Sequence, residues 1–435
     1  MNRRWRTPPG SGPSLSDAGE WRSGVPQRLR PGYVPVAAAG LLMLACGCKT
    51  AEKAEPTWLF FPSPPEKPRI QFLTWASGAA EVEPPRTSFE EFILGEEPQA
   101  PRQINKPYGV AVHDGSVYVC DTKDICICKL DFKNKTYSVF GYQGPGRLRK
   151  PINICIDPLG YKFVADPFRR QIVVFGPSDN FVSAFDVPQP GYPVDVALHG
   201  NELFVLDNDE TCQVVVLDRT TGEVLRTFGG PGREPGQFNR PSSLCTSPDG
   251  FLYVSDTHNF RVQKLTLEGE MVWVKGAPGY RLGQFGRPRG IRAGPDGIIY
   301  VTDGATEIVQ MFDPEGHILM RFAGPGNLPG ALVLPSTLAV DKNSAAFFQQ
   351  YVHKDFSVDY LLFVVSQYGP RLINVYAFGQ FPEGYRLAES QIRALPPVPV
   401  DEDQTPLPLP QGAQSPIDPA DNGQDAGAEP APEGA

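Results

Sequence analysis

A pattern that recurs six times along the middle of the chain constrains the fold more than any other feature. Each copy opens with a proline and continues through a short strand, a turn and a second, alternating strand, and the first five copies close with an aspartate. A unit of about 42 to 48 residues that contains four short strands has the length of one β-propeller blade. Six copies therefore predict six blades. The opening prolines are Pro107, Pro151, Pro193, Pro241, Pro288 and Pro335.

The composition agrees with an all-β chain. The 435 residues include 44 Gly and 47 Pro, which interrupt the chain too often for long helices. Within the copies, Asp-Gly and Glu-Gly turns separate segments of alternating apolar and polar residues, a pattern typical of antiparallel strands joined by tight turns. We expect an all-β, six-bladed β-propeller of four-stranded antiparallel blades over residues 69–395.

The ring needs a strand that joins its two ends. The stretch RIQFLTWASG (69–78) has the pattern of the outermost strands of the other copies. We expect it to complete the sixth blade beside RLINVYAFG (371–379), because an open ring would leave a strand edge exposed. The alternative is that YRLAESQIRAL (385–395) supplies this strand.

The N-terminal segment predicts export. Arg28 and Arg30 precede the apolar run VPVAAAGLLMLAC, which is too short for a stable membrane span and suits the apolar region of a signal peptide. The run ends in LACGC, which resembles a bacterial lipobox. That resemblance implies that Cys46, or else Cys48, carries a lipid that attaches the protein to the outer membrane or cell surface. Residues 1–45 would then be removed and residues 46–68 would form a tether. A plain secretory signal is the alternative.

The C-terminal segment has a composition of its own. Residues 396–435 contain eight acidic residues and no Lys or Arg, so they account for most of the formal charge of −9. The segment is rich in Pro, Ala, Asp and Gln and nearly lacks aromatic and β-branched residues. It therefore cannot bury enough surface to offset the entropy lost on ordering. We predict a disordered acidic tail.

The fourth copy carries the most specific motif. The stretch PGQFNRPSSLCTSPDGFLYVSDTHNFRVQKLTLEGE resembles an NHL repeat, with Asp256, Asn259 and Arg261 in its Asp-x-x-Asn-x-Arg signature. The other copies match only in part, so the resemblance implies the propeller fold more than a shared ligand. Some NHL domains bind RNA on a basic face, but the expected export argues against a nucleic acid as the partner here.

The closing aspartates suggest a structural role. Asp256 ends a strand, where its carboxylate can accept the free N–H groups of the next turn, and Arg261 returns beside it. Related aspartates recur at the same position of other copies, so we interpret them as corner braces rather than ligand contacts. His258 has no counterpart in the other copies, and we place it at an exposed loop tip. The related aspartates are Asp121, Asp166, Asp207 and Asp303.

Basic residues collect in two kinds of loop, those from fourth to first strands and those from second to third strands. Both kinds emerge on one face of a propeller, called the loop face below. We predict that this face binds an envelope protein or an anionic polymer, and solvated loops without a ligand are the alternative. The predicted ligand-binding residues are Arg169, Arg170, Arg261, Arg287, Arg289, His258, Phe238 and Phe285.

An enzyme is the alternative function, because the six-bladed relatives include metal-dependent lactonases and lyases. The five histidines fall in different turns and should not converge on one zinc ion. On the innermost strands, Asn153 and Asp195 are neighbours and could hold a divalent ion such as calcium or zinc. A second carboxylate is missing from that column, so we favour a binding or scaffolding protein without a cofactor.

Four cysteines and one arginine in or near the strands of the repeat also carry structural expectations. Cys155 and Cys245 share a position that is mostly Ala in other copies, so we expect small core fillers. Arg292 occupies the same position of the fifth copy and would place a charge near the central channel. Cys120 and Cys126 end a short loop and could form a disulfide in an oxidising compartment.

Overall fold

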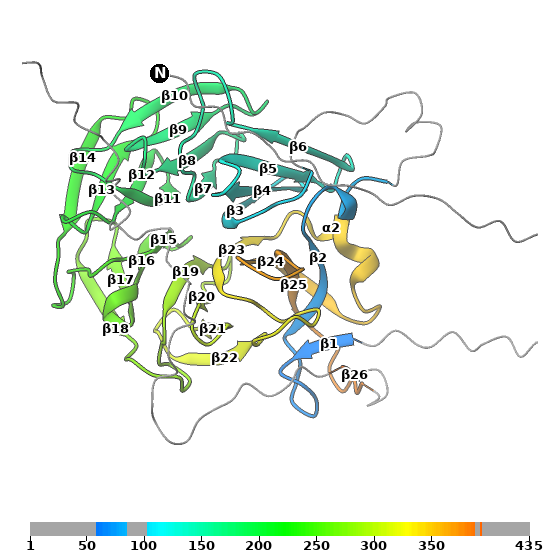
Figure 1. Cartoon of the computed structure of the whole chain (residues 1–435). Helices are drawn as coiled ribbons and strands as arrows, with labels where there is room; N and C mark the ends of the chain where they lie inside the picture. The colour runs from blue at the N-terminus through cyan, green and yellow to red at the C-terminus, as the bar shows by residue number, and fades with distance from the viewer. Residues whose placement is uncertain (1–57, 85–101, 388–391, 394–435) are drawn as a thin grey trace, which may run out of the picture. The chain divides into compact units, whose positions relative to one another are not determined.

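The computed structural model describes residues 58–84, 102–387 and 392–393 (Figure 1). The predicted signal, the lipidation candidates Cys46 and Cys48, and the acidic tail of residues 396–435 lie outside the described residues. Within the described part of the chain, no helix is both long and apolar enough to cross a bilayer.

Six antiparallel blades form the described structure, which confirms the predicted six-bladed propeller. Five of them are four-stranded sheets, each built from strands consecutive in sequence. Their strands are β3 (Pro107–His113), β4 (Ser116–Asp121), β5 (Cys126–Asp131) and β6 (Thr136–Phe140) in blade 1; β7 (Asn153–Ile156), β8 (Lys162–Asp166), β9 (Gln171–Phe175) and β10 (Phe181–Asp186) in blade 2; β11 (Pro193–His199), β12 (Glu202–Asp207), β13 (Gln213–Asp218) and β14 (Val224–Gly229) in blade 3; β15 (Ser243–Thr246), β16 (Phe251–Asp256), β17 (Arg261–Thr266) and β18 (Met271–Lys275) in blade 4; and β19 (Pro288–Ala293), β20 (Ile299–Asp303), β21 (Ile308–Phe312) and β22 (Ile318–Phe322) in blade 5.

The innermost strands follow one another around the ring. Each one contacts the innermost strand of the next blade, from β3 through β7, β11, β15 and β19 to β23 (Pro335–Asp341), and β23 returns to β3. Apolar side chains of adjacent blades pack between the sheets, for example Phe204 and Val254, which lie in one buried cluster. The core is therefore distributed between blades, and each blade depends on its neighbours.

The sixth blade joins the two ends of the ring. It contains β23, β24 (Ser357–Ser366) and β25 (Ile373–Gln380), and the next strand is β2 (Ile70–Ala76). Strand β2 pairs antiparallel with β25, from Ile70 opposite Phe378 to Ala76 opposite Ile373. Figure 1 shows these two strands side by side. Residues 385–395 do not take this place, because β26 (Ile392–Arg393) pairs with β1 at the edge of the sheet.

A strand that the sequence analysis did not predict extends this blade. Strand β1 (Trp58–Phe61) pairs antiparallel with β2, and its Leu59 and Phe60 side chains are buried. It lies within residues 46–68, which we expected to form a tether. The segment WLFF is too apolar to remain in water, and β2 offers it a free edge. The blade therefore begins before residue 69.

An insertion in the sixth blade fastens the two chain ends. It contains helix α2 (Ala345–Phe348) and the 3₁₀ turn η3 (Gln349–Tyr351). Two residues after this turn, His353 is buried, and its ring centroid lies 5.3 Å from those of Trp58 and Phe381 and 6.0 Å from that of Tyr385. The histidine thus sits between β1 and the segment that follows β25, and burial lowers its pKa below the ordinary value.

This histidine predicts a pH dependence of stability. Because its pKa is lowered in the folded state, His353 stays neutral while the unfolded chain takes up a proton near pH 6.5. The free energy of unfolding should therefore fall as the pH decreases through and below this value. The measurement is the urea midpoint between pH 8 and pH 5. His353→Gln should flatten the profile; equal profiles for wild type and His353→Gln would contradict the assignment.

The disulfide considered for Cys120 and Cys126 is not formed. In the register of β4 and β5, Cys120 lies opposite Ile127, and Cys126 lies opposite Asp121. The two thiols therefore point to opposite faces of the blade, into different hydrophobic clusters. Both cysteines are free and buried.

Candidate functional site

The closing aspartates hold the loop face in shape. In blade 2, Asp166 accepts the backbone N–H groups of Arg149 at 2.6 Å, Lys150 at 3.0 Å and Arg169 at 3.1 Å. The same carboxylate thus holds the loop before the blade and the loop after its second strand. In blades 1 and 5, Asp121 and Asp303 hold the corresponding loops in the same way. The expected bracing role is what the structure shows.

In blade 4 the signature arginine completes the brace. Nε of Arg261 donates to Oδ2 of Asp256 at 2.8 Å, and its other nitrogens donate to the carbonyl oxygens of Arg233, Glu234 and Gln237 at 2.7 to 3.0 Å. Only 11% of the Arg261 side chain is exposed. We therefore correct its assignment: Arg261 organises the loop that precedes the blade and has little surface left for a ligand.

The two predicted aromatic contacts are also not at the surface. Phe238 and Phe285 are fully buried. Each ring lies against a glycine with positive φ, where a Cβ atom on Gly229 or Gly276 would come within 2.5 Å and 2.8 Å of the ring. Their position in loops suggested that the two rings are exposed. An apolar ring is instead buried beneath its loop where a glycine without a side chain provides the space. These residues anchor the loops and do not form a binding surface.

Arg289 is likewise buried, with 2% of its surface exposed. Its Nη1 donates to Oε1 of Gln367 at 2.9 Å, and its guanidinium lies over the ring of Tyr108 at 5.1 Å. Its assignment as a surface contact is therefore corrected as well. The reason is its place in the innermost strand, directly after the leading proline, where the neighbouring blades surround it.

Of the other predicted residues, Arg170 and His258 are exposed, and Arg169 and Arg287 are half-buried. Arg169 supports the loop before its blade, since Nη1 donates to the carbonyl oxygen of Arg147 at 2.6 Å. Arg170 bonds through Nη1 to the side chain of Gln189. The exposed part of the predicted site is thus Arg170 in blade 2 and His258 in blade 4.

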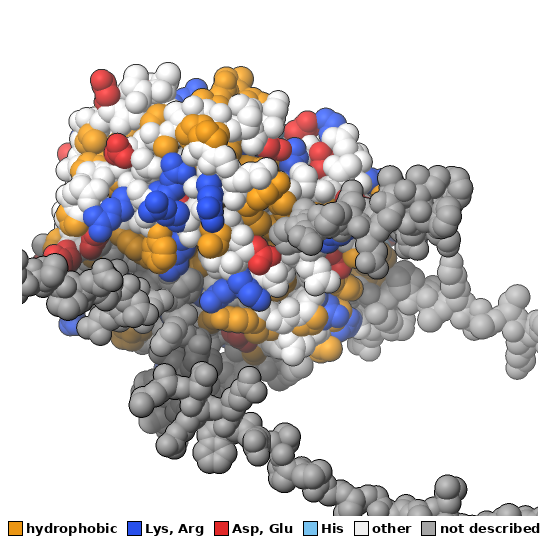
Figure 2. All heavy atoms as spheres, turned by 45° about the horizontal axis from the view of Figure 1, so that its top comes forward, with side chains coloured by type: hydrophobic (Ala, Val, Ile, Leu, Met, Phe, Trp, Pro, Cys, Tyr) orange, Lys and Arg blue, Asp and Glu red, His pale blue; other side chains and the backbone are white. Residues whose placement is uncertain are grey.

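A hollow of about 630 Å³ lies between blades 1 and 2 on the loop face. Three arginines line it, Arg147, Arg149 and Arg169, together with the apolar Ile125 and Leu148. Figure 2 shows Lys and Arg side chains that gather, with hydrophobic side chains between them, on the side of the molecule where blades 1 and 2 lie.

Exposed aromatic residues accompany these cations, although not the ones that the sequence analysis named. Phe168 and Tyr142 are each 48% exposed, and Nζ of Lys150 lies 4.4 Å from the centre of the Phe168 ring. Phe168 occupies the tip of a loop from second to third strand, between Pro167 and Arg169. That position at a loop tip is the signal that could have identified it.

A ring of cations surrounds the axial opening of the loop face. The ring is formed by the residue that precedes the leading proline of each blade. These six residues encircle the opening because the innermost strands, which begin beside them, line the axis. All six are half-buried, and four carry a positive charge. Lys106 is not among the predicted site residues, although it occupies the same repeat position as Lys150, Arg240 and Arg287. The ring consists of Lys106, Lys150, Tyr192, Arg240, Arg287 and Leu334.

A second hollow, of about 710 Å³, lies at the opposite end of the channel. The ends of innermost strands and their following turns contribute His199 and Lys342, and the turn after β13 contributes Arg219. Arg219 is paired there with the buried Asp157 at 3.2 Å. Groups from blades 2 to 6 therefore converge on the face opposite the loop face, but the predicted site residues do not lie there.

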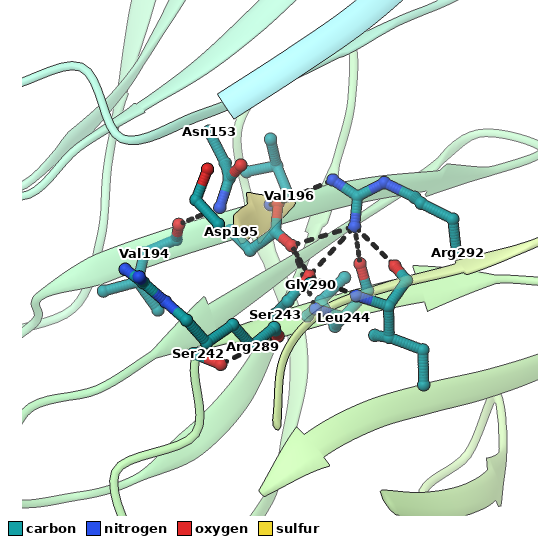
Figure 3. Close-up of polar contacts among 12 residues, drawn as sticks. Asn153, Val194, Asp195, Val196, Ser242, Ser243, Leu244, Arg289, Gly290 and Arg292 are labelled. Carbon is teal, nitrogen blue, oxygen red and sulfur yellow. Dashed lines mark hydrogen bonds and ion pairs between the residues drawn. The ribbon is translucent and has the colours of Figure 1, made fainter. Parts of the chain in front are cut away.

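Between the two ends, polar contacts join the innermost strands of blades 3, 4 and 5 (Figure 3). Oδ2 of Asp195 accepts from Oγ of Ser243 at 2.6 Å, from the N–H of Leu244 at 3.0 Å and from Nη1 of Arg292 at 3.2 Å. Its Oδ1 accepts the N–H of Val196 at 2.8 Å. The carboxylate therefore already has a cation, the guanidinium of Arg292.

This arrangement bears on the metal alternative. Asn153 and Asp195 are both fully buried and lie close together, as expected, but Asn153 turns its Nδ2 toward the carbonyl oxygen of Val194 at 3.0 Å. A divalent ion would have to displace Arg292 from Asp195. Near them, burial raises the pKa of Cys245 to about 12, so this channel thiol is protonated at neutral pH.

Among the described residues, one group of three side chains has the spacing of metal ligands. Asp313, Glu315 and His317 share the turn between the third and fourth strands of blade 5, and Glu315 and His317 are exposed. Nδ1 of His317 lies 2.9 Å from Oδ2 of Asp313. These contacts explain the conformation of the turn without a ligand.

The fold and its braces define a six-bladed β-propeller with one well-formed NHL repeat. The family model of the NHL repeat matches residues 238–265, in blade 4. Similar solved structures include a streptogramin B lyase (17% identity, 63% of this chain and 83% of that chain, TM-score 0.45) and a virginiamycin B lyase from Staphylococcus aureus (15%, 63% and 85%, 0.45). A protein of unknown function from Bacteroides thetaiotaomicron is also similar (15%, 71% and 75%, 0.49). At these identities, the similarity concerns architecture alone.

Proposed function

We propose that this protein is a binding or scaffolding module whose loop face engages an anionic partner in the cell envelope. One observation carries the proposal: residues 144–150 and 167–170, which form the two loops of blade 2 on this face, contain five cations and no acidic residue. They line or adjoin the hollow between blades 1 and 2. A propeller that carries an NHL repeat is suited to a binding role.

The physical basis is electrostatic attraction to a surface of fixed shape. Backbone bonds to Asp166 hold both loops, so the arginine side chains begin from ordered positions and lose less entropy on binding. The exposed Phe168 ring beside Lys150 adds an apolar contact next to the charges. Together these groups suit an acidic envelope protein or an anionic polymer better than a neutral ligand.

The proposed location rests on the sequence of residues 1–48. An export signal followed by lipid attachment at Cys46, or at Cys48, would hold the propeller at a membrane of the cell envelope. In that compartment an envelope protein or a polymer is accessible and a nucleic acid is not. Loss of fatty-acid labelling in Cys46→Ser or Cys48→Ser would identify the modified residue.

The loop face can be tested by a change of charge. Replacing the exposed Arg147, Arg149 and Arg170 by Gln should weaken binding to polyglutamate by about tenfold, since each exposed ion pair contributes about 0 to 1 kcal/mol. The wild-type affinity should fall with rising salt, because ions screen exposed charges. The measurement is titration of polyglutamate at two salt concentrations, repeated with a sulfated polysaccharide to compare a protein-like and a sugar-like polyanion.

The control carries the same charge change on the opposite face. Lys133, Lys135 and Lys342 are exposed in turns of that face, and their replacement by Gln should leave binding nearly unchanged. If both triple variants bind as wild type does, or if both lose affinity equally, the loop face is not the binding surface.

A further inference from the structure

Arg289 is a buried cation without a carboxylate partner. Only 2% of its surface is exposed, and no acidic side chain among residues 58–84, 102–387 and 392–393 forms an ion pair with it. Arg292, three residues along the same strand, is paired with Asp195. Burial of an unpaired charge is strongly unfavourable, so proteins retain one mainly where something else supplies the opposite charge.

Two hydrogen-bond donors at this place are also unused. Arg289 donates from Nη1 to Oε1 of Gln367, which is itself 1% exposed. Nη2 of Arg289 and Nε2 of Gln367 are both buried and have no hydrogen-bond partner. Buried donors are almost always satisfied in native proteins. A guanidinium nitrogen and an amide nitrogen of two bonded side chains therefore both remain available to an acceptor.

The pair lies at the loop-face end of the channel. Figure 3 shows the guanidinium of Arg289 pointing away from Asp195. It lies over the ring of Tyr108, which follows directly after Lys106 and Pro107 at the start of blade 1. The N–H of Gln367 donates to the carbonyl oxygen of Leu334, a member of the axial ring, at 3.3 Å. Nζ of Lys106 lies 5.9 Å from the ring centre of Tyr368.

We propose that Arg289 and Gln367 form a subsite for one oxyanion group, a carboxylate or a phosphate, at the axial opening of the loop face. The two free donors would bind two oxygens of the group, a geometry that guanidinium and amide groups favour. Lys106 and the other cations of the axial ring would attract it. The inference rests on the proposed function, because the subsite would receive an acidic group of the partner that the loop face captures.

The test compares the melting temperatures of variants at two buried arginines, which are expected to change in opposite directions. In low-salt buffer free of oxyanions, Arg289→Met should raise the melting temperature by about 2 °C, because it removes an unpaired buried charge without changing the volume much. Arg292→Met should lower it, because it leaves Asp195 unpaired. Wild-type protein should gain melting temperature from phosphate or acetate relative to chloride at equal ionic strength, and Arg289→Met should lose this gain. If phosphate alone raises the melting temperature, the subsite is specific for phosphate. If phosphate and acetate both raise it, the subsite accepts oxyanions in general.

Gln367→Leu is a second variant that keeps the charge of Arg289 and removes one donor. It should fold and should show a smaller response to the oxyanions than wild type. The subsite is wrong if the wild type does not respond to either oxyanion, if Arg289→Met keeps the response, or if Arg289→Met is destabilised as strongly as Arg292→Met.

The same measurements separate this subsite from the proposed function. The variant at Arg147, Arg149 and Arg170 should keep the response to phosphate or acetate while it loses affinity for polyglutamate. If that variant retains polyglutamate binding, the proposed function fails independently of the subsite. If only the phosphate and acetate responses are absent, the subsite fails and the loop face remains the binding surface.

Discussion

A chain that lacks residues 66–80 is expected to lose on the order of 5 kcal/mol or more of its free energy of unfolding. Strand β2 pairs with β25 over its whole length and buries Ile70 and Ala76. It also carries β1, so the deletion releases the buried Leu59 and Phe60. Loss of these contacts removes several buried side chains, each worth about 1.5 to 3 kcal/mol, and exposes the edge of β25.

Denaturant unfolding monitored by tryptophan fluorescence and circular dichroism measures this effect. The midpoint should fall sharply, and the transition should broaden if the open ring unfolds blade by blade. Removal of residues 396–435, predicted to be disordered, serves as the control and should leave the midpoint in place. A midpoint that does not move when residues 66–80 are removed would show that the ring is closed by another route.

Arg292→Met is expected to lower the free energy of unfolding by about 3 to 5 kcal/mol, the usual cost of breaking a buried ion pair from one side. The guanidinium bonds to Asp195 of blade 3 and to Ser243 and Leu244 of blade 4, and it extends from blade 5. One side chain thus connects three innermost strands. Its loss leaves the fully buried Asp195 carboxylate without a cation.

A double-mutant cycle identifies the origin of this loss. The double variant with Asp195→Asn and Arg292→Met should lose less free energy of unfolding than the two single variants lose in sum. The reason is that the double variant retains no uncompensated buried charge. Additive effects would contradict a direct pair. The cycle also bears on the metal alternative, since a site for calcium or zinc at Asp195 requires that these ions raise the melting temperature of the wild type, and we expect no such rise while Arg292 occupies the carboxylate.

The repeat made most of the fold predictable from sequence. Alternation with a period of two fixes which face of each strand is buried, so the six leading prolines and the closing aspartates were enough to identify the blades. The bracing role of Asp256 was predictable for the same reason, because a carboxylate at the end of a strand meets the free N–H groups of the next turn. The strand pattern of residues 69–78 also pointed to the place where β2 pairs.

Loop side chains obeyed no such rule. Phe238, Phe285 and Arg289 belong to loops or strand starts that a sequence places on one face, but contacts with neighbouring blades decide whether each side chain points outward. Strand β1 was missed because a run of four apolar residues has no periodicity, and only the free edge of β2 gives these residues a partner. The position of Arg292 predicted a charge near the channel, but the pairing of Arg292 with Asp195 depends on the order of the blades around the ring.

The sequence by itself therefore determined the number of blades, their strand pattern, the aspartate braces and the basic character of the loops. The tertiary structure alone decided which of those basic residues are exposed, which cation neutralises Asp195, and that Arg289 and Gln367 meet at the axis. The physical reason is the range of the contacts involved. Strands and turns are specified by neighbours a few residues away, whereas the burial and pairing of a charge depend on side chains from other blades, far apart in sequence.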